Sequence, residues 1–172
     1  MAPTLVVLRD EQSLSDSAVG ISAAVDYQET YQGNGVKYTL THLSQHNVKD
    51  ELFVVQKTLD SGEENVYVCF SLNDNPEGGR EEFNFLFGND DMYLASIFQD
   101  DVEFVGIHNM NCQVDSSVLP DEVPGFVTEY RAEDVENPCV FVFETIDPND
   151  ADSYITFVQG VQVQKKEVEF LC

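Results

Sequence analysis

The stretch 81–108 constrains the fold most, because it holds three short apolar runs separated by turn residues. The first run carries phenylalanine at every second position: Phe83, Phe85 and Phe87. A period of two places all three rings on one face of a strand. Two more apolar runs follow, at 92–98 and 102–108. Short runs joined by tight turns predict an antiparallel meander of three strands here.

The rest of the chain repeats this pattern, with apolar runs bounded by Gly, Pro, Asn, Asp and Ser. We expect further strands at 4–8, 18–25, 36–41, 52–55, 66–72, 126–130, 140–143, 155–163 and 167–172, and a short extra one within 112–118. Helical periodicity is nearly absent, and only 129–136 could form a single helical turn.

About twelve strands without crossover helices predict an all-β, antiparallel fold. The length of 172 residues suits one domain spanning 1–172. The strands divide into three sets of four, near 4–58, 65–110 and 125–172, which favours a β-trefoil. A β-sandwich or jelly roll is the alternative.

The charge of the chain restricts its partners. There are 32 acidic and 8 basic residues, which give a net charge of −24 and a pI near 4.1. Binding to a nucleic-acid backbone or an anionic membrane is disfavoured, since both need a positive surface. A basic partner protein would be attracted, although the charge also serves solubility alone.

The cysteines are spread along the chain, at Cys69, Cys112, Cys139 and Cys172. They could form two disulfides in any of three connectivities. Cys69 and Cys139 also lie inside apolar runs, where a free cysteine behaves as a small hydrophobic residue. The sequence shows no apolar run of membrane-spanning length and no signal-peptide pattern. We expect an extracellular protein, with a cytoplasmic location as the alternative.

No motif in the sequence indicates catalysis, so we expect no enzyme, no cofactor and no metal. His42 and His46 are four residues apart, but they flank the end of a predicted strand, where that spacing does not form a metal site. The segment 147–152 is rich in Asp and Asn, as a calcium loop would be, but it lacks the EF-hand spacing.

Three further segments are informative: Ala2-Pro3 followed by Leu8-Arg9-Asp10-Glu11-Gln12-Ser13-Leu14, then Asn65-Val66-Tyr67-Val68-Cys69 with Asn73-Asp74-Asn75-Pro76, and Pro138-Cys139-Val140-Phe141-Val142. Together they resemble segments of the interleukin-1 family of β-trefoil cytokines. The resemblance implies a trefoil that binds a receptor ectodomain through its loops and performs no catalysis. The Trp that many members carry is absent.

These observations favour a soluble, non-enzymatic protein-binding domain, in its most concrete form an interleukin-1-like signalling ligand or antagonist. The partner contacts would come from loop residues: Arg9, Asp10, Asp74, Glu77, Asp147 and Asp150. One alternative is an acidic decoy that sequesters a basic partner, such as a chemokine, a histone or a DNA-binding protein. Another is a structural protein of a coat or matrix.

Overall fold

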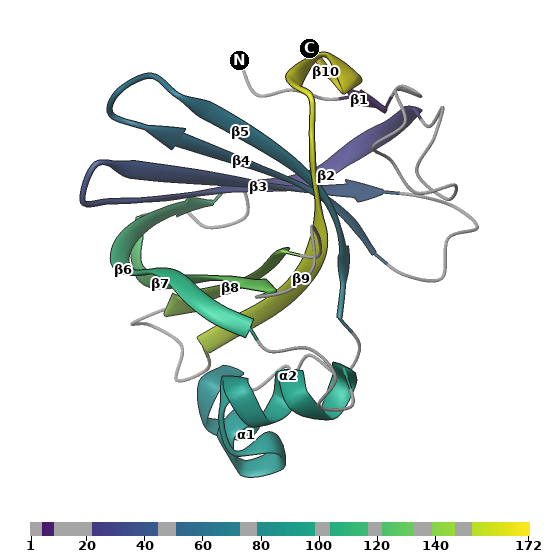
Figure 1. Cartoon of the computed structure of the whole chain (residues 1–172). Coiled ribbons are helices and arrows are strands. Elements are labelled where there is room, and N and C mark those ends of the chain that lie inside the picture. Colours follow the sequence, from purple (N-terminus) through teal and green to yellow (C-terminus); the bar gives the residue numbers. More distant parts are fainter. Residues whose placement is uncertain are drawn as a thin grey trace.

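The structure, a computed structural model, describes residues 5–8, 22–44, 51–72, 79–98, 104–116, 122–132, 139–146 and 153–172 (Figure 1). The strands are β1 (Leu5–Leu8), β2 (Ser22–Gly33), β3 (Val36–Ser44), β4 (Leu52–Leu59), β5 (Glu64–Ser71), β6 (Phe104–Ser116), β7 (Val123–Ala132), β8 (Cys139–Ile146), β9 (Ser153–Val163) and β10 (Val168–Leu171). The α-helices are α1 (Gly79–Phe87) and α2 (Asp90–Phe98), and a short 3-10 helix spans Lys165–Glu167.

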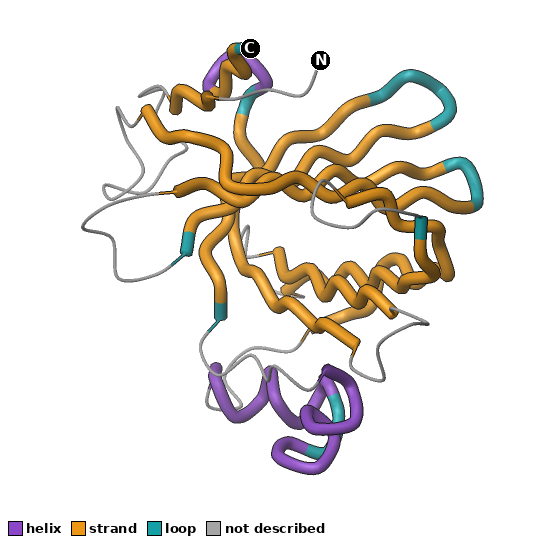
Figure 2. The backbone as a smooth tube through the Cα atoms, turned by 180° about the vertical axis from the view of Figure 1, so that it is seen from behind, coloured by secondary structure: helices purple, strands orange, loops and turns teal. Residues whose placement is uncertain are grey.

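Eight of the described strands close into an antiparallel barrel built from two meanders. Strands β2 to β5 pair in chain order, and so do β6 to β9. Two nonlocal pairings, β5 with β9 and β2 with β6, then close the ring (Figure 1, Figure 2).

The prediction of an all-β, antiparallel fold is therefore confirmed. Eight of the ten described strands form two sets of four rather than three, and the barrel is closed, so the topology differs from both the favoured trefoil and the sandwich. Counting strands could not reveal this, because the pairings that close the barrel join residues far apart in the chain.

Strand β2 belongs to two layers. Its first residues pair with β1, and its last residues pair with β6 in the barrel. A register shift between Val25 and Tyr27 accompanies the change of partner, as a β-bulge does when it bends a strand. Since β1 also pairs with β10, these elements form a small layer over the outer face of β4 and β5. The buried contacts of this layer come from Val6, Ala23, Leu43, Leu52, Val54, Val66, Val68, Val163 and Val168.

Burial on both faces explains the solid apolar runs. In β4, Phe53 and Val55 face the barrel interior, while Leu52 and Val54 face the outer layer. Strand β8 is buried over seven consecutive residues for the same reason. A strand covered on both faces reads as a continuous apolar run, since neither face meets water.

The prediction of strands at 81–87 and 92–98 is wrong, because these segments are the helices α1 and α2. Phe83 and Phe87 are four residues apart, so they share one face in a helix as well as in a strand. Their rings pack 5.0 Å apart, and Phe83 stacks on Phe157 of β9 at 4.7 Å. Phe85 points to solvent instead. Over its described residues, from 104, the third predicted run is a strand, and β6 continues from it to Ser116, within the segment expected at 112–118.

The two helices form a hairpin that packs against the outer face of β8 and β9 at one end of the barrel (Figure 1, Figure 2). Phe83, Tyr93 and Leu94 are the buried anchors, and Phe87 and Ile97 pack beside them. The hairpin is thereby held on a rigid sheet rather than on a loop.

Candidate functional site

The helical hairpin presents large apolar side chains to solvent on the side away from the barrel. Phe85 is 87% exposed, Met92 59% and Leu86 55%, the three highest values among the exposed large hydrophobic residues of the described chain. We call these three residues the hairpin surface. Single exposed apolar residues are ordinary, but here three lie within residues 85–92 of one hairpin that is packed on the barrel, which makes this hairpin a candidate interaction site.

Local hydrogen bonds fix the turn that joins the two helices. Gly88 has a φ of 90°, a conformation that glycine adopts without strain, and its N–H donates to the carbonyl of Asn84 at 2.9 Å. The side-chain oxygen of Asn89 accepts the N–H of Met92 at 2.8 Å, as an N-cap does at the start of a helix. Leu86 and Met92, on either side of this turn, are thus held in place by backbone structure.

Acidic residues surround the hairpin surface. The segment 79–98 contains four acidic residues and one Arg. Glu81 and Glu82 are exposed in the first turn of α1, and Asp90 begins α2, where its carboxylate accepts the Tyr130 hydroxyl at 3.3 Å. The exposed apolar group therefore lies in a negative field.

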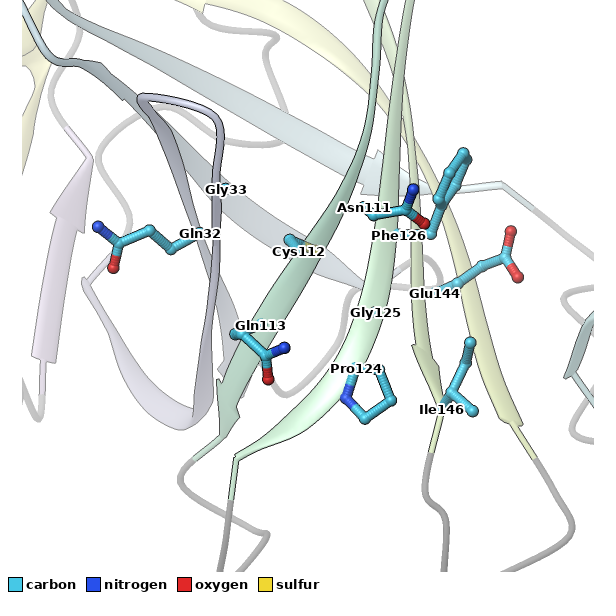
Figure 3. Close-up of a pocket in the computed structure, with 10 residues that line it drawn as sticks. All are labelled: Gln32, Gly33, Asn111, Cys112, Gln113, Pro124, Gly125, Phe126, Glu144 and Ile146. Carbon is cyan, nitrogen blue, oxygen red and sulfur yellow. The ribbon is translucent and has the colours of Figure 1, made fainter.

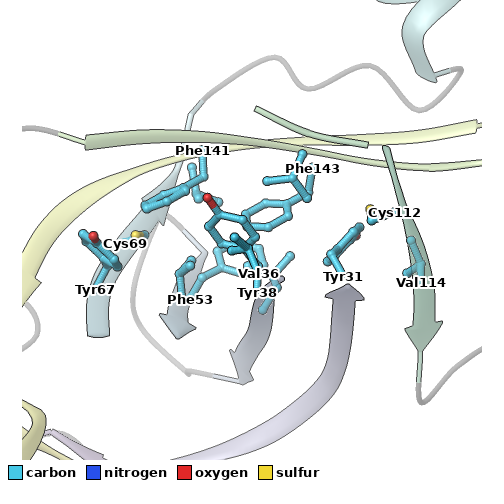
Figure 4. Close-up of a cluster of buried hydrophobic side chains, with 14 of the residues drawn as sticks. Tyr31, Val36, Tyr38, Phe53, Tyr67, Cys69, Cys112, Val114, Phe141 and Phe143 are labelled. Carbon is cyan, nitrogen blue, oxygen red and sulfur yellow. The ribbon is translucent and has the colours of Figure 1, made fainter. Parts of the chain in front are cut away.

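The barrel interior is filled with side chains. Phe141 lies 4.9 Å from Tyr67 and 6.1 Å from both Tyr38 and Phe143, as measured between ring centroids (Figure 4). An eight-stranded barrel is just wide enough for its own side chains to fill it. Where these four rings pack, the barrel interior is therefore a hydrophobic core.

One buried ionic group lies inside the barrel, centred on Glu129. The Tyr38 hydroxyl and the Lys57 ammonium both donate to its Oε1 at 2.9 Å. Arg131 Nε is 3.5 Å from Oε2, which has no hydrogen-bond partner. Burial, with the nearby Glu129 carboxylate, raises the pKa of Tyr67 to about 12, and burial likewise raises the pKa of Tyr38. Both phenols therefore stay neutral near pH 7.

A groove of about 590 Å³ lies on the outside of the barrel. It lies where the ends of β2, β6, β7 and β8 meet (Figure 3). Its lining mixes apolar groups with side-chain amides and one carboxylate: Gln32, Gly33, Asn111, Cys112, Gln113, Pro124, Gly125, Phe126, Glu144 and Ile146. The groove contains no pair of reactive groups, so it is a candidate for contact rather than for chemistry.

The six loop residues proposed as partner contacts all lie outside the described residues. They are Arg9, Asp10, Asp74, Glu77, Asp147 and Asp150. The calcium candidate at 147–152 and His46 also lie outside them. His42 is engaged locally: its Nδ1 lies 2.8 Å from Asp26 Oδ2, and its ring packs 4.8 Å from that of Phe53. Among the described residues, no three His, Cys, Asp or Glu side chains are arranged to hold a metal ion.

The predicted disulfides are not present. Cys69, Cys112 and Cys139 are buried free thiols, and Cys172 is an exposed free thiol. Strand β9 lies between Cys69 and Cys139, so their Cα atoms are two strand spacings apart, about 9.5 Å in total. This distance exceeds the Cα separation that a disulfide tolerates.

Sequence reasoning missed the hairpin surface because it assigned this segment to strands. The usable signal was the Asn89 cap followed by apolar residues at 93, 94 and 97, which indicates α2 but not α1.

Comparisons of the chain with protein-family models, with curated proteins and with solved structures find no match. Neither α-helix of the described chain has the length and apolar character needed to cross a membrane.

Proposed function

We propose that this protein is a non-enzymatic binding domain whose hairpin surface docks a basic, amphipathic segment of a partner protein. The carrying observation is the 87% exposure of Phe85 on a helix whose opposite face is anchored to the barrel. Aromatic, Leu and Met side chains provide the apolar centre of many protein interfaces. A rigid scaffold lowers the entropy that such a contact loses on binding.

The charge around the hairpin surface selects the partner. Glu81 and Glu82 lie beside the apolar residues, and the whole chain carries −24. Two of the eight basic residues, Lys57 and Arg131, are engaged with Glu129, which leaves even fewer cations to offset the acidic exterior. A segment with Lys or Arg flanking apolar residues would satisfy both features. A second copy of this chain would bring like charges together and is disfavoured.

This proposal combines two of the functions considered from the sequence. It keeps protein binding without catalysis, and it takes the basic partner from the acidic-decoy hypothesis. The interleukin-1-like receptor ligand depends on the short sequence matches alone, since its loop contacts lie outside the described residues and the described strands form two meanders.

The test uses a labelled synthetic peptide of Leu and Lys arranged as an amphipathic helix, with binding followed by fluorescence anisotropy. Phe85→Ser should weaken binding about tenfold or more, as expected for the centre of an interface. It should leave the unfolding midpoint unchanged, because Phe85 is already in solvent. Leu171→Ser is the matched control, since Leu171 is 37% exposed on β10, which lies at the end of the molecule opposite the hairpin (Figure 1), and should not contribute.

Three outcomes would contradict the proposal. Equal binding by Phe85→Ser and wild type would remove the hairpin surface from the interface. Equal binding of a scrambled Leu/Lys peptide, with affinity lost completely in high salt, would indicate capture by charge alone, as in the decoy hypothesis. Self-association of the wild type in light scattering, abolished by Phe85→Ser, would show that the occupant is a second copy.

A further inference from the structure

Two thiols lie on either side of one glycine inside the barrel. Gly160 of β9 is the register partner of Cys69 on β5 and also of Cys139 on β8. Both cysteines belong to the buried cluster that fills the barrel, so their side chains face inward from strands flanking β9. This pair is independent of the hairpin surface.

The absent side chain of Gly160 leaves room for sulfur. A Cβ built on Gly160 would lie 2.5 Å from Cys69 Sγ and 2.7 Å from Cys69 Cα. The Cys69 thiol therefore lies over Gly160, the residue of β9 that stands between Cys69 and Cys139. Electrostatic coupling to Cys139 contributes to the raised pKa of Cys69, after the larger effect of burial, which agrees with this proximity.

The distance between the two cysteine strands is too long for a disulfide, but it suits a bridge through a metal ion. Two flat-sheet spacings give about 9.5 Å between the two Cα atoms, and the inward curvature of a barrel shortens this distance somewhat. A disulfide needs a Cα separation of roughly 4.4–6.8 Å. Replacing one S–S bond by two metal–sulfur bonds of about 2.3 Å adds about 2.5 Å to that reach.

We propose that Cys69 and Cys139 form a two-coordinate site for a soft, thiophilic cation of the copper(I) class, held between the strands above Gly160. Soft thiolate ligands select such ions, and a linear bis-thiolate needs no third protein ligand. Two protons leave the thiols and two sulfur–copper bonds form, so that two thiols and one Cu⁺ give an anionic bis-thiolate and two H⁺. Copper keeps its oxidation state throughout.

Neighbouring cations suit the anionic product. Arg131 is the register partner of Cys139 across β7 and β8. Burial raises the pKa of Cys139 most; Arg131 lowers it, the Glu129 carboxylate raises it, and Lys57 lowers it. The two cations exceed the single Glu129 carboxylate by one charge, which an anionic bis-thiolate would balance. Cys139 is the first residue of β8 and is 7% exposed, so it is less deeply buried than Cys69, which is 0% exposed.

The test is an anaerobic titration with copper(I), supplied as its acetonitrile complex, into a Cys172→Ser background that lacks the exposed thiol. Native mass spectrometry should show one copper per chain, with an ultraviolet thiolate-to-copper charge-transfer band. Cys69→Ala and Cys139→Ala should each abolish both signals. Cys112→Ala is the matched control and should retain them, since Cys112 is also buried and inward-facing but has no partner thiol in register.

X-ray absorption on the copper-loaded Cys172→Ser protein gives a readout that does not depend on further variants. Two sulfur neighbours are expected. Failure to bind copper, a single sulfur neighbour, or loss of binding in Cys112→Ala would overturn the assignment. So would a Cys69–Cys139 disulfide formed under mild oxidation with diamide, because it would place the Cα atoms too close for the proposed bridge.

Discussion

Removing the Lys57 ammonium tests the energetics of the barrel interior most directly. Glu129 is fully buried, and its Oε1 accepts the Lys57 ammonium and the Tyr38 hydroxyl at 2.9 Å each. In Lys57→Met the carboxylate keeps Tyr38 on Oε1 and has only Arg131, at 3.5 Å, near Oε2. Breaking a buried ion pair from one side typically costs about 3–5 kcal/mol, because the remaining charge stays buried.

We expect Lys57→Met to lie at the lower end of that range, about 3 kcal/mol, because Arg131 remains close to the carboxylate. Urea unfolding can be followed by far-ultraviolet circular dichroism or by the fluorescence of the seven tyrosines, since the chain has no Trp. With a slope of about 2 kcal/mol per molar urea, the midpoint should fall by about 1.5 M.

Two further variants turn this result into a test of mechanism. Lys57→Met/Glu129→Gln removes both charges and keeps an acceptor for Tyr38, so it should recover much of the lost stability. Lys165→Met breaks an exposed pair with Glu64, in which Lys165 is 72% exposed, and should cost no more than about 1 kcal/mol. The reasoning is refuted if Lys57→Met behaves like Lys165→Met, or if the double variant is no more stable than Lys57→Met.

Two other predictions concern backbone approach and acid titration. In Gly160→Ala the new Cβ would collide with the carbonyl oxygen of Val68, so β5 and β9 must separate, at a cost of about 2–3 kcal/mol in urea unfolding. Gly106→Ala, whose Cβ would have its nearest neighbour at 3.7 Å, should equal or slightly exceed wild-type stability, and equal losses in both would contradict the packing argument. Burial raises the pKa of Glu29, so the folded chain binds a proton more tightly there and stability falls as pH rises from the ordinary carboxyl pKa through the raised one. Glu29→Gln should therefore be more stable than wild type at pH 7, with the gap closing as pH falls, and a gap that does not change with pH would contradict the titration argument.

Local sequence pattern was sufficient where burial alone decides structure. The solid run 140–143 predicts a strand, and β8 contains it because both faces of that strand are covered. The Asn34–Gly35 turn is also readable, since both residues adopt positive φ in the β2–β3 hairpin and this residue pair is favoured there.

Local pattern failed at the hairpin because two periods agree there. Phe83 and Phe87 share one face in a strand and also in a helix. Only Phe85 separates the two structures, because a strand would place it on that same face, whereas in the helix it is exposed. The helical form is selected by the apolar outer face of β8 and β9, including Phe157, which lies far away in the chain. The hairpin surface, the strongest functional candidate, could not be found without that contact.

The sequence by itself determined that this chain makes antiparallel sheet and carries an acidic exterior, because alternation, turn residues and charge are properties of neighbouring positions. Only the tertiary structure decided that the sheet closes into a barrel, that Glu129 meets Lys57 inside it, and that three apolar side chains remain in solvent. Each of these depends on pairings between distant segments, whose free energy no local window of the chain contains.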